Sequence, residues 1–197
     1  MKYALVLLIL FIFSFLIITC NDSQEKPAEL QELEFSIDAS LISVSIADSV
    51  YLIRFSPPVN WQLIPLDILK GLAKEHGEIR IVPLYIFGNA EQFSALNVSK
   101  IEFSDTTIQD KTKFELYEKI IKEAFSDQLI KQGNFKKDGI IIHQFLIKSD
   151  KMINFKLIFK NSKGEYIQFD YSSQNEHYPK VLKAIESSIG SIKLINY

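Results

Sequence analysis

Three histidines are the side chains of this sequence best suited to act as a general base or a metal ligand near neutral pH. His76 follows Glu75 and precedes Gly77-Glu78, so a carboxylate and an imidazole could share a metal ion there. No second ligand stands four residues further on, which favours a basic residue at the negative end of a helix instead. His177 follows Glu176 and is expected to face solvent in the first turn of another helix.

His143 is the histidine that could take part in catalysis. It follows the apolar run Ile140-Ile141-Ile142, and Asp138 lies shortly before that run. An imidazole base combined with scattered carboxylates would make a hydrolase. The apolar neighbours favour a half-buried histidine of a β-sheet, so we keep His143 as a candidate binding residue and a hydrolase as the lesser alternative.

The usual catalytic and cofactor-binding motifs are absent from the sequence. It contains no H-E-x-x-H, no G-x-S-x-G, and no glycine-rich pattern that would hold a phosphate. Cys20 is the sole cysteine, which excludes a C-x-x-C motif and a zinc site built on cysteine pairs. We therefore expect no catalytic residue, no metal and no cofactor, and a protein that is not an enzyme.

Trp61 is the second candidate binding residue. It could line a ligand groove together with other aromatic side chains, but strand aromatics are ordinarily packing residues, which favours the core. The aromatic residues that could share either environment are Phe55, Tyr85, Phe87, Tyr166, Phe169 and Tyr171.

The N-terminus indicates where the protein is located. Lys2 precedes an apolar run from Tyr3 to Ile18, which is the pattern of an export signal. The end of this run, Leu16-Ile17-Ile18-Thr19-Cys20, resembles a bacterial lipoprotein signal, in which the lipidated cysteine becomes the mature N-terminus. The resemblance implies a signal peptide over residues 1–19, a lipidated Cys20 that begins a flexible acidic tether over residues 20–35, and a domain over residues 36–197.

An uncleaved membrane helix is the alternative for the same segment, because a spanning helix needs about 20 apolar residues, or roughly 17 at the short end. Both interpretations place the domain on the non-cytoplasmic side, facing the periplasm or the exterior. The whole chain carries 22 basic and 24 acidic residues, and beyond the tether they are interspersed. This balance excludes the basic patch that nucleic-acid binding requires.

The hydrophobic periodicity predicts an α+β domain, with an antiparallel β-sheet layered with α-helices. Pro83 argues that its strand lies at an edge, because proline cannot donate to a β-ladder. The predicted strands are Ser36–Ala47, Val50–Phe55, Ile79–Phe87, Phe93–Phe103, Gly139–Lys148, Met152–Lys160, Glu165–Tyr171 and Ser191–Ile195. The predicted helices are Leu66–His76, Asp110–Gln132 and a final helix capped by Asn175 and closed by Gly190.

The strand Met152–Lys160 allows a test of register, because its side chains alternate between the two faces of the sheet. If this strand lies against the helix Asp110–Gln132, Phe155 and Phe159 should be buried together under that helix. Lys156 and Lys160 should then point away from it.

The order of these elements resembles the PsbP-like (Mog1p/PsbP) fold, which includes small bacterial lipoproteins. The resemblance covers about residues 46 to 195 and implies an α/β/α sandwich and a non-catalytic accessory role; it transfers no catalytic residue. The segments that carry it are Phe55–Trp61, Leu96-Asn97-Val98, the helix around Tyr117, Asp138-Gly139, Lys163–Tyr171, and Lys183–Ser188 leading into Ser191-Ile192.

Together these observations predict a membrane-tethered, non-catalytic lipoprotein of the cell envelope that acts as an accessory or binding module for an envelope complex. Its expected partners are the membrane, through the N-terminal lipid, and an envelope protein. A small-ligand or lipid carrier is the alternative, and a large apolar cavity behind Trp61 would distinguish it.

Overall fold

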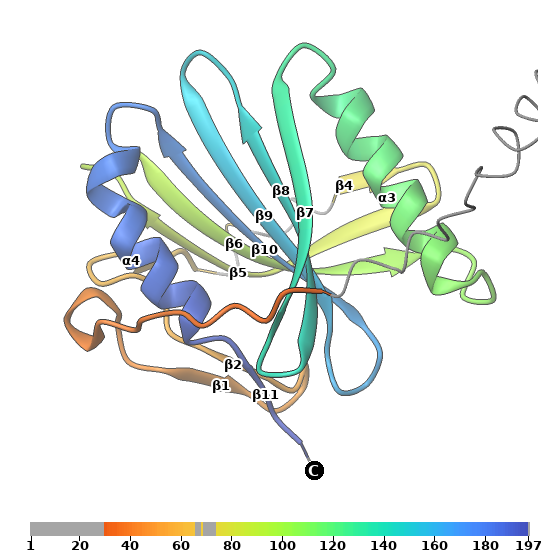
Figure 1. The fold of residues 1–197 in the computed structure, drawn as a ribbon, viewed down its shortest axis with the longest axis horizontal. Coiled ribbons are helices and arrows are strands. Elements are labelled where there is room, and N and C mark those ends of the chain that lie inside the picture. The colour runs from red at the N-terminus through yellow and green to blue at the C-terminus, as the bar shows by residue number, and fades with distance from the viewer. Residues whose placement is uncertain (1–29, 66–67, 69–73, 197) are drawn as a thin grey trace, which may run out of the picture. The chain divides into compact units, whose positions relative to one another are not determined.

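The computed structural model describes residues 30–65, 68 and 74–196, which form two antiparallel sheets and two long helices (Figure 1). The predicted signal and residues 20–29 of the predicted tether, Cys20 included, lie outside the described residues, whereas residues 30–35 of that tether are described. In chain order the elements are η1 (Ala39–Leu41), β1 (Ile46–Asp48), β2 (Ile53–Phe55), β3 (Gln62–Leu63), β4 (Lys74–His76), β5 (Ile79–Asn89), β6 (Ser94–Phe103), α3 (Asp110–Ala124), β7 (Leu129–Lys137), β8 (Ile140–Lys148), β9 (Met152–Lys160), β10 (Tyr166–Gln174), α4 (Tyr178–Gly190) and β11 (Lys193–Leu194).

The larger sheet has eight strands in the order β3-β5-β6-β10-β9-β8-β7, with β4 also paired to β5. The smaller sheet has the order β1-β2-β11. Strands β7 to β10 form a meander, and its last turn ends at Gly164, whose φ of +78° suits glycine. The side-chain oxygen of Asn161 accepts from the N–H groups of Lys163 and Glu165 and so fixes this turn. The α+β class, with an antiparallel sheet layered with helices, is confirmed.

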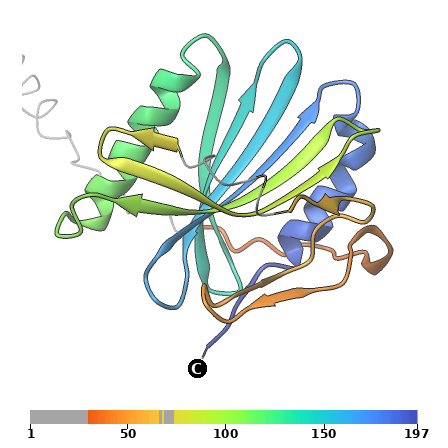
Figure 2. The same ribbon diagram turned by 180° about the vertical axis from the view of Figure 1, so that it is seen from behind.

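Helices α3 and α4 cover opposite faces of the meander (Figure 1). On the α4 face, alternate side chains of β9 and β10 pack against Val181, Ile185 and Ile189. The small sheet closes the same core, because the Phe55 ring on β2 lies 5.1 Å from the Phe169 ring on β10. On the other face, α3 buries Tyr117 and Ile121 against a smaller cluster. Strands β5 and β6 extend as far as α3 (Figure 2).

The register of β9 differs from its predicted contact. Leu157 and Phe159 are fully buried and Phe155 is half-buried, all on the α4 face and not under the Asp110 helix. Lys156 and Lys160 point to the opposite face, which is the one that α3 covers. Lys156 is buried there because it forms an ion pair with Asp170 and lies 5.8 Å from the Phe125 ring. The prediction that the aromatic residues and the lysines of this strand lie on opposite faces is confirmed. The prediction that the aromatic residues pack under the Asp110 helix was wrong, because they pack against α4.

The predicted helix Asp110–Gln132 is too long. It ends at Ala124, and Leu129–Lys137 forms the edge strand β7, paired with β8 along all nine residues. Gly133 and Asn134, which directly follow the predicted helix, lie within this strand. Pairing with β8 satisfies the backbone of this polar segment and outweighs its helical periodicity.

Predictions near the N-terminal part of the domain were also wrong. The segment Ser36–Ala47 forms the short helix η1 and only the first two residues of β1. Strand β2 begins at Ile53, since the N–H groups of Val50 and Tyr51 bind the Asp48 carboxylate in a turn. The predicted helix Leu66–His76 lies largely outside the described residues, and its last three residues form β4.

Two further predictions concern single residues. Asn175 does not cap α4: its side-chain amide donates to the carbonyls of Ser149 and Asp150, and His177 occupies the N-cap position. Pro83 lies in β5 at a β-bulge, between the short stretches that β3 and β4 pair with. Pro83 pairs with Ser99 of β6 on one side and has no partner among the described strands on the other, which fits the expected edge position.

Candidate functional site

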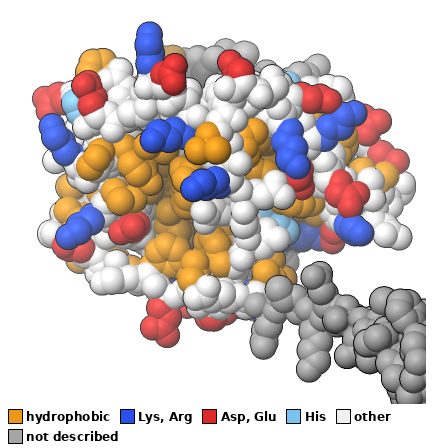
Figure 3. All heavy atoms as spheres, turned by 45° about the horizontal axis from the view of Figure 1, so that its top comes forward, with side chains coloured by type: hydrophobic (Ala, Val, Ile, Leu, Met, Phe, Trp, Pro, Cys, Tyr) orange, Lys and Arg blue, Asp and Glu red, His pale blue; other side chains and the backbone are white. Residues whose placement is uncertain are grey.

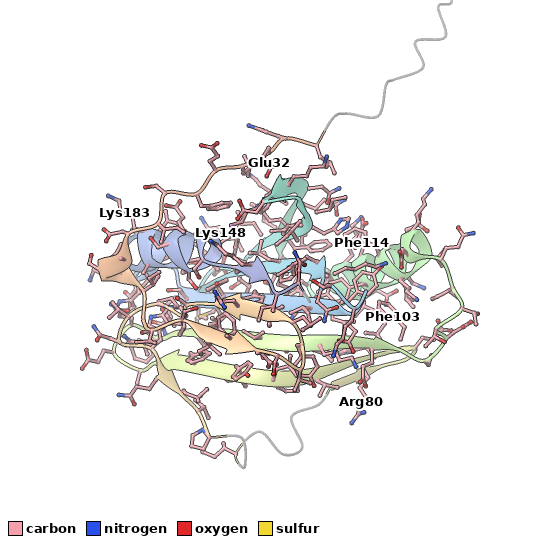
Figure 4. All side chains as sticks on the ribbon, turned by 90° about the horizontal axis from the view of Figure 1, so that it is seen from below. Glu32, Arg80, Phe103, Phe114, Lys148 and Lys183 are labelled. Atoms are coloured by element: carbon pink, nitrogen blue, oxygen red, sulfur yellow. The ribbon has the colours of Figure 1, made fainter. Side chains whose placement is uncertain are left out.

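A cavity of about 690 Å³ lies between the first turns of α3 and the ends of β8, β9 and β10. Its size falls in the usual range for small-ligand pockets. Phe114 points from α3 toward the strands (Figure 4), and Ile141, Phe159 and Leu194 add further apolar surface. The polar groups that line it are Asp110, Lys111, Glu115, Glu118, His143, Lys160 and Tyr166.

Phe114 and His143 form one wall of this cavity. Their ring centroids are 3.8 Å apart with an interplanar angle of 31°, and Phe114 also lies 5.9 Å from the Phe145 ring. Helical periodicity places Phe114 one turn before Glu118, on the side of α3 that crosses β8. The helix thus brings an aromatic ring onto a strand histidine and holds both at the surface of the cavity.

His143 is held in one tautomer. Its Nδ1 lies 2.8 Å from the side-chain oxygen of Asn134 on the neighbouring strand β7. Because that oxygen can only accept, Nδ1 carries the proton and Nε2 keeps its lone pair. Burial lowers the pKa of His143 below its usual value of 6.5, so the neutral imidazole persists at neutral pH.

The carboxylates of the cavity are paired with lysines. Asp110 forms an ion pair with Lys160, and this contact lowers the pKa of Asp110 while Tyr166 donates a further hydrogen bond to it at 3.1 Å. The ion pair with Lys122 likewise lowers the pKa of Glu118. His143 is hydrogen-bonded to the side-chain amide of Asn134 and not to a carboxylate, so the arrangement suits binding better than acid–base catalysis.

The comparisons with known proteins agree with this architecture. The structure is similar to the solution structure of cyanobacterial PsbP (CyanoP) from Synechocystis sp. PCC 6803, with a TM-score of 0.52, covering 81% of this chain and 95% of that one. The fold is PsbP-like. At 14% sequence identity, the likeness shows the fold alone. No family model matches the sequence, and no curated protein matches it.

Within this PsbP-like fold, the candidate residues from the sequence lie apart. His143 lines the cavity, whereas Trp61 is 5% exposed in the α4-side core, with its ring 6.5 Å from that of Tyr171. A second hollow, of about 1030 Å³, is lined by the neighbours Asn60 and Gln62 and not by Trp61 itself. Cys20 lies outside the described residues.

The other two histidines lie elsewhere. His76 is exposed at the end of β4, a strand and not the helix end that was predicted. His177 precedes α4, with its Nε2 3.3 Å from Glu176 and its ring 5.8 Å from that of Phe93. Among the described residues, no three His, Cys, Asp or Glu side chains are placed to hold a metal ion. In the same part of the chain, no helix has the length and apolar character needed to cross a membrane.

Sequence reasoning missed most of the cavity. It gave Phe114 and Asp110 no role beyond the predicted helix, placed Lys160 only in the register of its strand, and named Tyr166 only among the aromatic residues of a groove or core around Trp61. The sequence carries no signal for this grouping, because it arises only when α3 crosses the meander. The one usable hint was a histidine among isoleucines on a strand.

Proposed function

We propose that this protein is a membrane-tethered, non-catalytic accessory module of the cell envelope, and that it binds a small, largely apolar ligand in the cavity beside His143. The observation that carries the proposal is the cavity itself, with its aromatic wall of Phe114 and His143. Acidic and basic side chains are interspersed around exposed hydrophobic ones in the view of Figure 3, as on a surface that meets a ligand or protein and not a nucleic acid.

Ligand binding can be tested with hexanol as an uncharged apolar probe. The full-length chain, embedded in lipid nanodiscs and labelled at its isoleucine δ1 methyl groups, is titrated and followed by NMR. We expect the Ile141 methyl resonance to shift and saturate, because Ile141 lines the cavity and is 46% exposed. No shift of Ile141, with hexanol present at millimolar concentration, would contradict the proposed site.

Anchoring is tested at Cys20. Metabolic labelling with a fatty-acid analogue should label the wild-type chain and not a Cys20→Ala variant. Equal labelling of both chains would refute lipidation at this residue. Loss of label with retained membrane association would favour the uncleaved anchor helix instead.

The accessory role predicts an envelope protein partner. Cross-linking in intact cells, followed by purification of the tethered chain, should recover the same partner in replicate experiments. The Cys20→Ala variant, released from the membrane, should recover less of it. Failure to recover a reproducible partner would leave the chain as a ligand carrier and count against the accessory role.

A hydrolase is the rival function, since His143 lies at a cavity and its Nε2 keeps a lone pair. The chain should hydrolyse simple nitrophenyl esters no faster than its His143→Gln variant. Turnover that exceeds the variant by about a hundredfold, the usual contribution of a general base, would favour the hydrolase.

A further inference from the structure

We infer that the ligand of this cavity carries an ammonium group on an apolar body. The inference rests on the proposed function, since it assigns a chemical class to the ligand of the same cavity. It follows from the carboxylate acceptors at the rim, the acceptor on His143 and the apolar surface between them.

The rim of the cavity carries three carboxylates, and each is in contact with a lysine. Asp110 pairs with Lys160 and Glu115 with Lys111, while Glu118 pairs with Lys122, which does not itself line the cavity. Because these charges balance, the ligand preference of the rim depends on which groups remain free to form hydrogen bonds.

The two lysines are poorly placed to bind an anion. Lys160 is engaged by Asp110, and its Nζ lies 5.2 Å from the centre of the Tyr166 ring. The side chain of Lys111 is 85% exposed and extends into solvent, 3.8 Å from Glu115. An anionic ligand would have to break the first pair or draw the second lysine inward, and either change reduces its affinity.

The carboxylates of the rim and His143 can still accept hydrogen bonds from a ligand. A carboxylate offers about four lone-pair sites, and one lysine contact leaves several of them free. His143 adds the lone pair of Nε2, since its Nδ1 proton is given to Asn134. A primary ammonium group has three N–H donors and no acceptor, which matches a rim of acceptors.

The apolar lining of the cavity indicates the chemistry of the rest of the ligand. Phe114 presents an aromatic ring, and Ile141 and Phe159 provide aliphatic and aromatic surface. A short alkyl chain fits this surface, and the ring of Phe114 also attracts a nearby cation. An alkylammonium ion is therefore the simplest molecule that satisfies both parts.

The test compares three probes of equal chain length: hexylammonium, hexanol and hexanoate. Each is titrated at neutral pH into the full-length chain in nanodiscs, with empty nanodiscs as the reference, and Ile141 methyl shifts give the dissociation constants. We expect hexylammonium to bind at least about tenfold more tightly than hexanoate, with hexanol between them. Equal or tighter binding of hexanoate would overturn the inference while leaving the cavity as a binding site.

Substitutions at the rim test whether its carboxylates cause the preference for hexylammonium over hexanoate. The double substitution Glu115→Gln with Glu118→Gln should abolish the preference for hexylammonium and leave hexanol binding intact, which also shows that the variant is folded. Glu123→Gln is the matched control, because Glu123 lies on the same helix, is 66% exposed and does not line the cavity. An unchanged preference in the double variant would overturn the role of the rim. Absence of binding by all three probes would instead contradict the proposed function.

Discussion

The two faces of the meander differ in how much apolar surface they bury. The α4 face, closed by α4 and the small sheet, holds a cluster of eighteen buried hydrophobic residues, against eight on the α3 face. Both faces also bury polar groups that bond to one another: the Tyr171 and Ser188 hydroxyls on the α4 face, and the Tyr117 hydroxyl with Gln168 on the α3 face. The larger apolar cluster concentrates the stability of the domain on the α4 face.

The cavity occurs on the face with the smaller core. Helix α3 buries only Tyr117 and Ile121, whereas α4 buries Val181, Ile185 and Ile189 together with its last residues. Elements with few buried contacts open at lower free energy than the core. We therefore expect the α4 face to determine global stability and the α3 face to respond to ligands.

Phe169→Ala should have the largest effect. The Phe169 ring is fully buried on the α4 face and contacts the rings of Phe55 and Phe159, at 5.1 and 5.7 Å. We expect its loss to lower the free energy of unfolding by about 3–5 kcal/mol, measured by urea denaturation. Phe155→Ala, at a half-buried position on the same face, should cost clearly less; equal losses would contradict this picture of the α4 face.

Gly190→Ala should come next. A Cβ at Gly190 would lie 2.8 Å from Cγ1 of Ile37 and 2.9 Å from Cβ of Phe35. These two residues belong to the segment of residues 31–38, which crosses α4 and would have to move. We expect a loss of about 1–3 kcal/mol. Gly133→Ala in β7 is the control, because its Cβ would meet nothing within 4 Å and its stability should be unchanged or slightly higher.

Tyr117→Phe tests the polar network of the α3 face. The change keeps the ring and removes the hydroxyl that donates to Gln168, which is itself buried. We expect a loss of about 1–2 kcal/mol in the free energy of unfolding, because Gln168 is left without this donor. A loss as large as that of Phe169→Ala would mean that the two faces contribute equally.

The smallest effect is the response to pH. The pKa of His143 is lowered by burial, so below its unfolded value of 6.5 the unfolded chain binds more protons than the folded one. Stability should therefore fall as the pH falls from 6.5 toward about 5. His143→Gln should lose this component of the slope in denaturation measured between these pH values, and an identical slope in both chains would contradict the assignment. Asp110 and Glu118, with lowered pKa values, act at lower pH than this window.

Prediction from the sequence succeeded where local pattern and pairing agree. Strand β9 was placed with its observed bounds because Ile153, Phe155 and Leu157 alternate with polar residues, and the turn at Asn161 fixes its partner. It failed at β7, since Leu129 is 57% exposed and the strand is held by β8 and not by an apolar face of its own. The cavity was out of reach because the contact of Phe114 with His143 is tertiary.

The attachments of residues 31–38, the segment that crosses α4, determine how the domain responds to a pulling force. Lys136 of β7 bonds through its N–H and C=O to Gln31 and Leu33, at 2.9 and 2.8 Å, and Glu32 lies beside that strand (Figure 4). Further along, the Asp38 N–H donates to the hydroxyl of Ser187, 3.1 Å away on α4. Tension applied to the chain at Gln31 is therefore borne first by the edge of β7 and then by α4. The small sheet and the hydrophobic core behind α4 bear load only after both attachments have yielded.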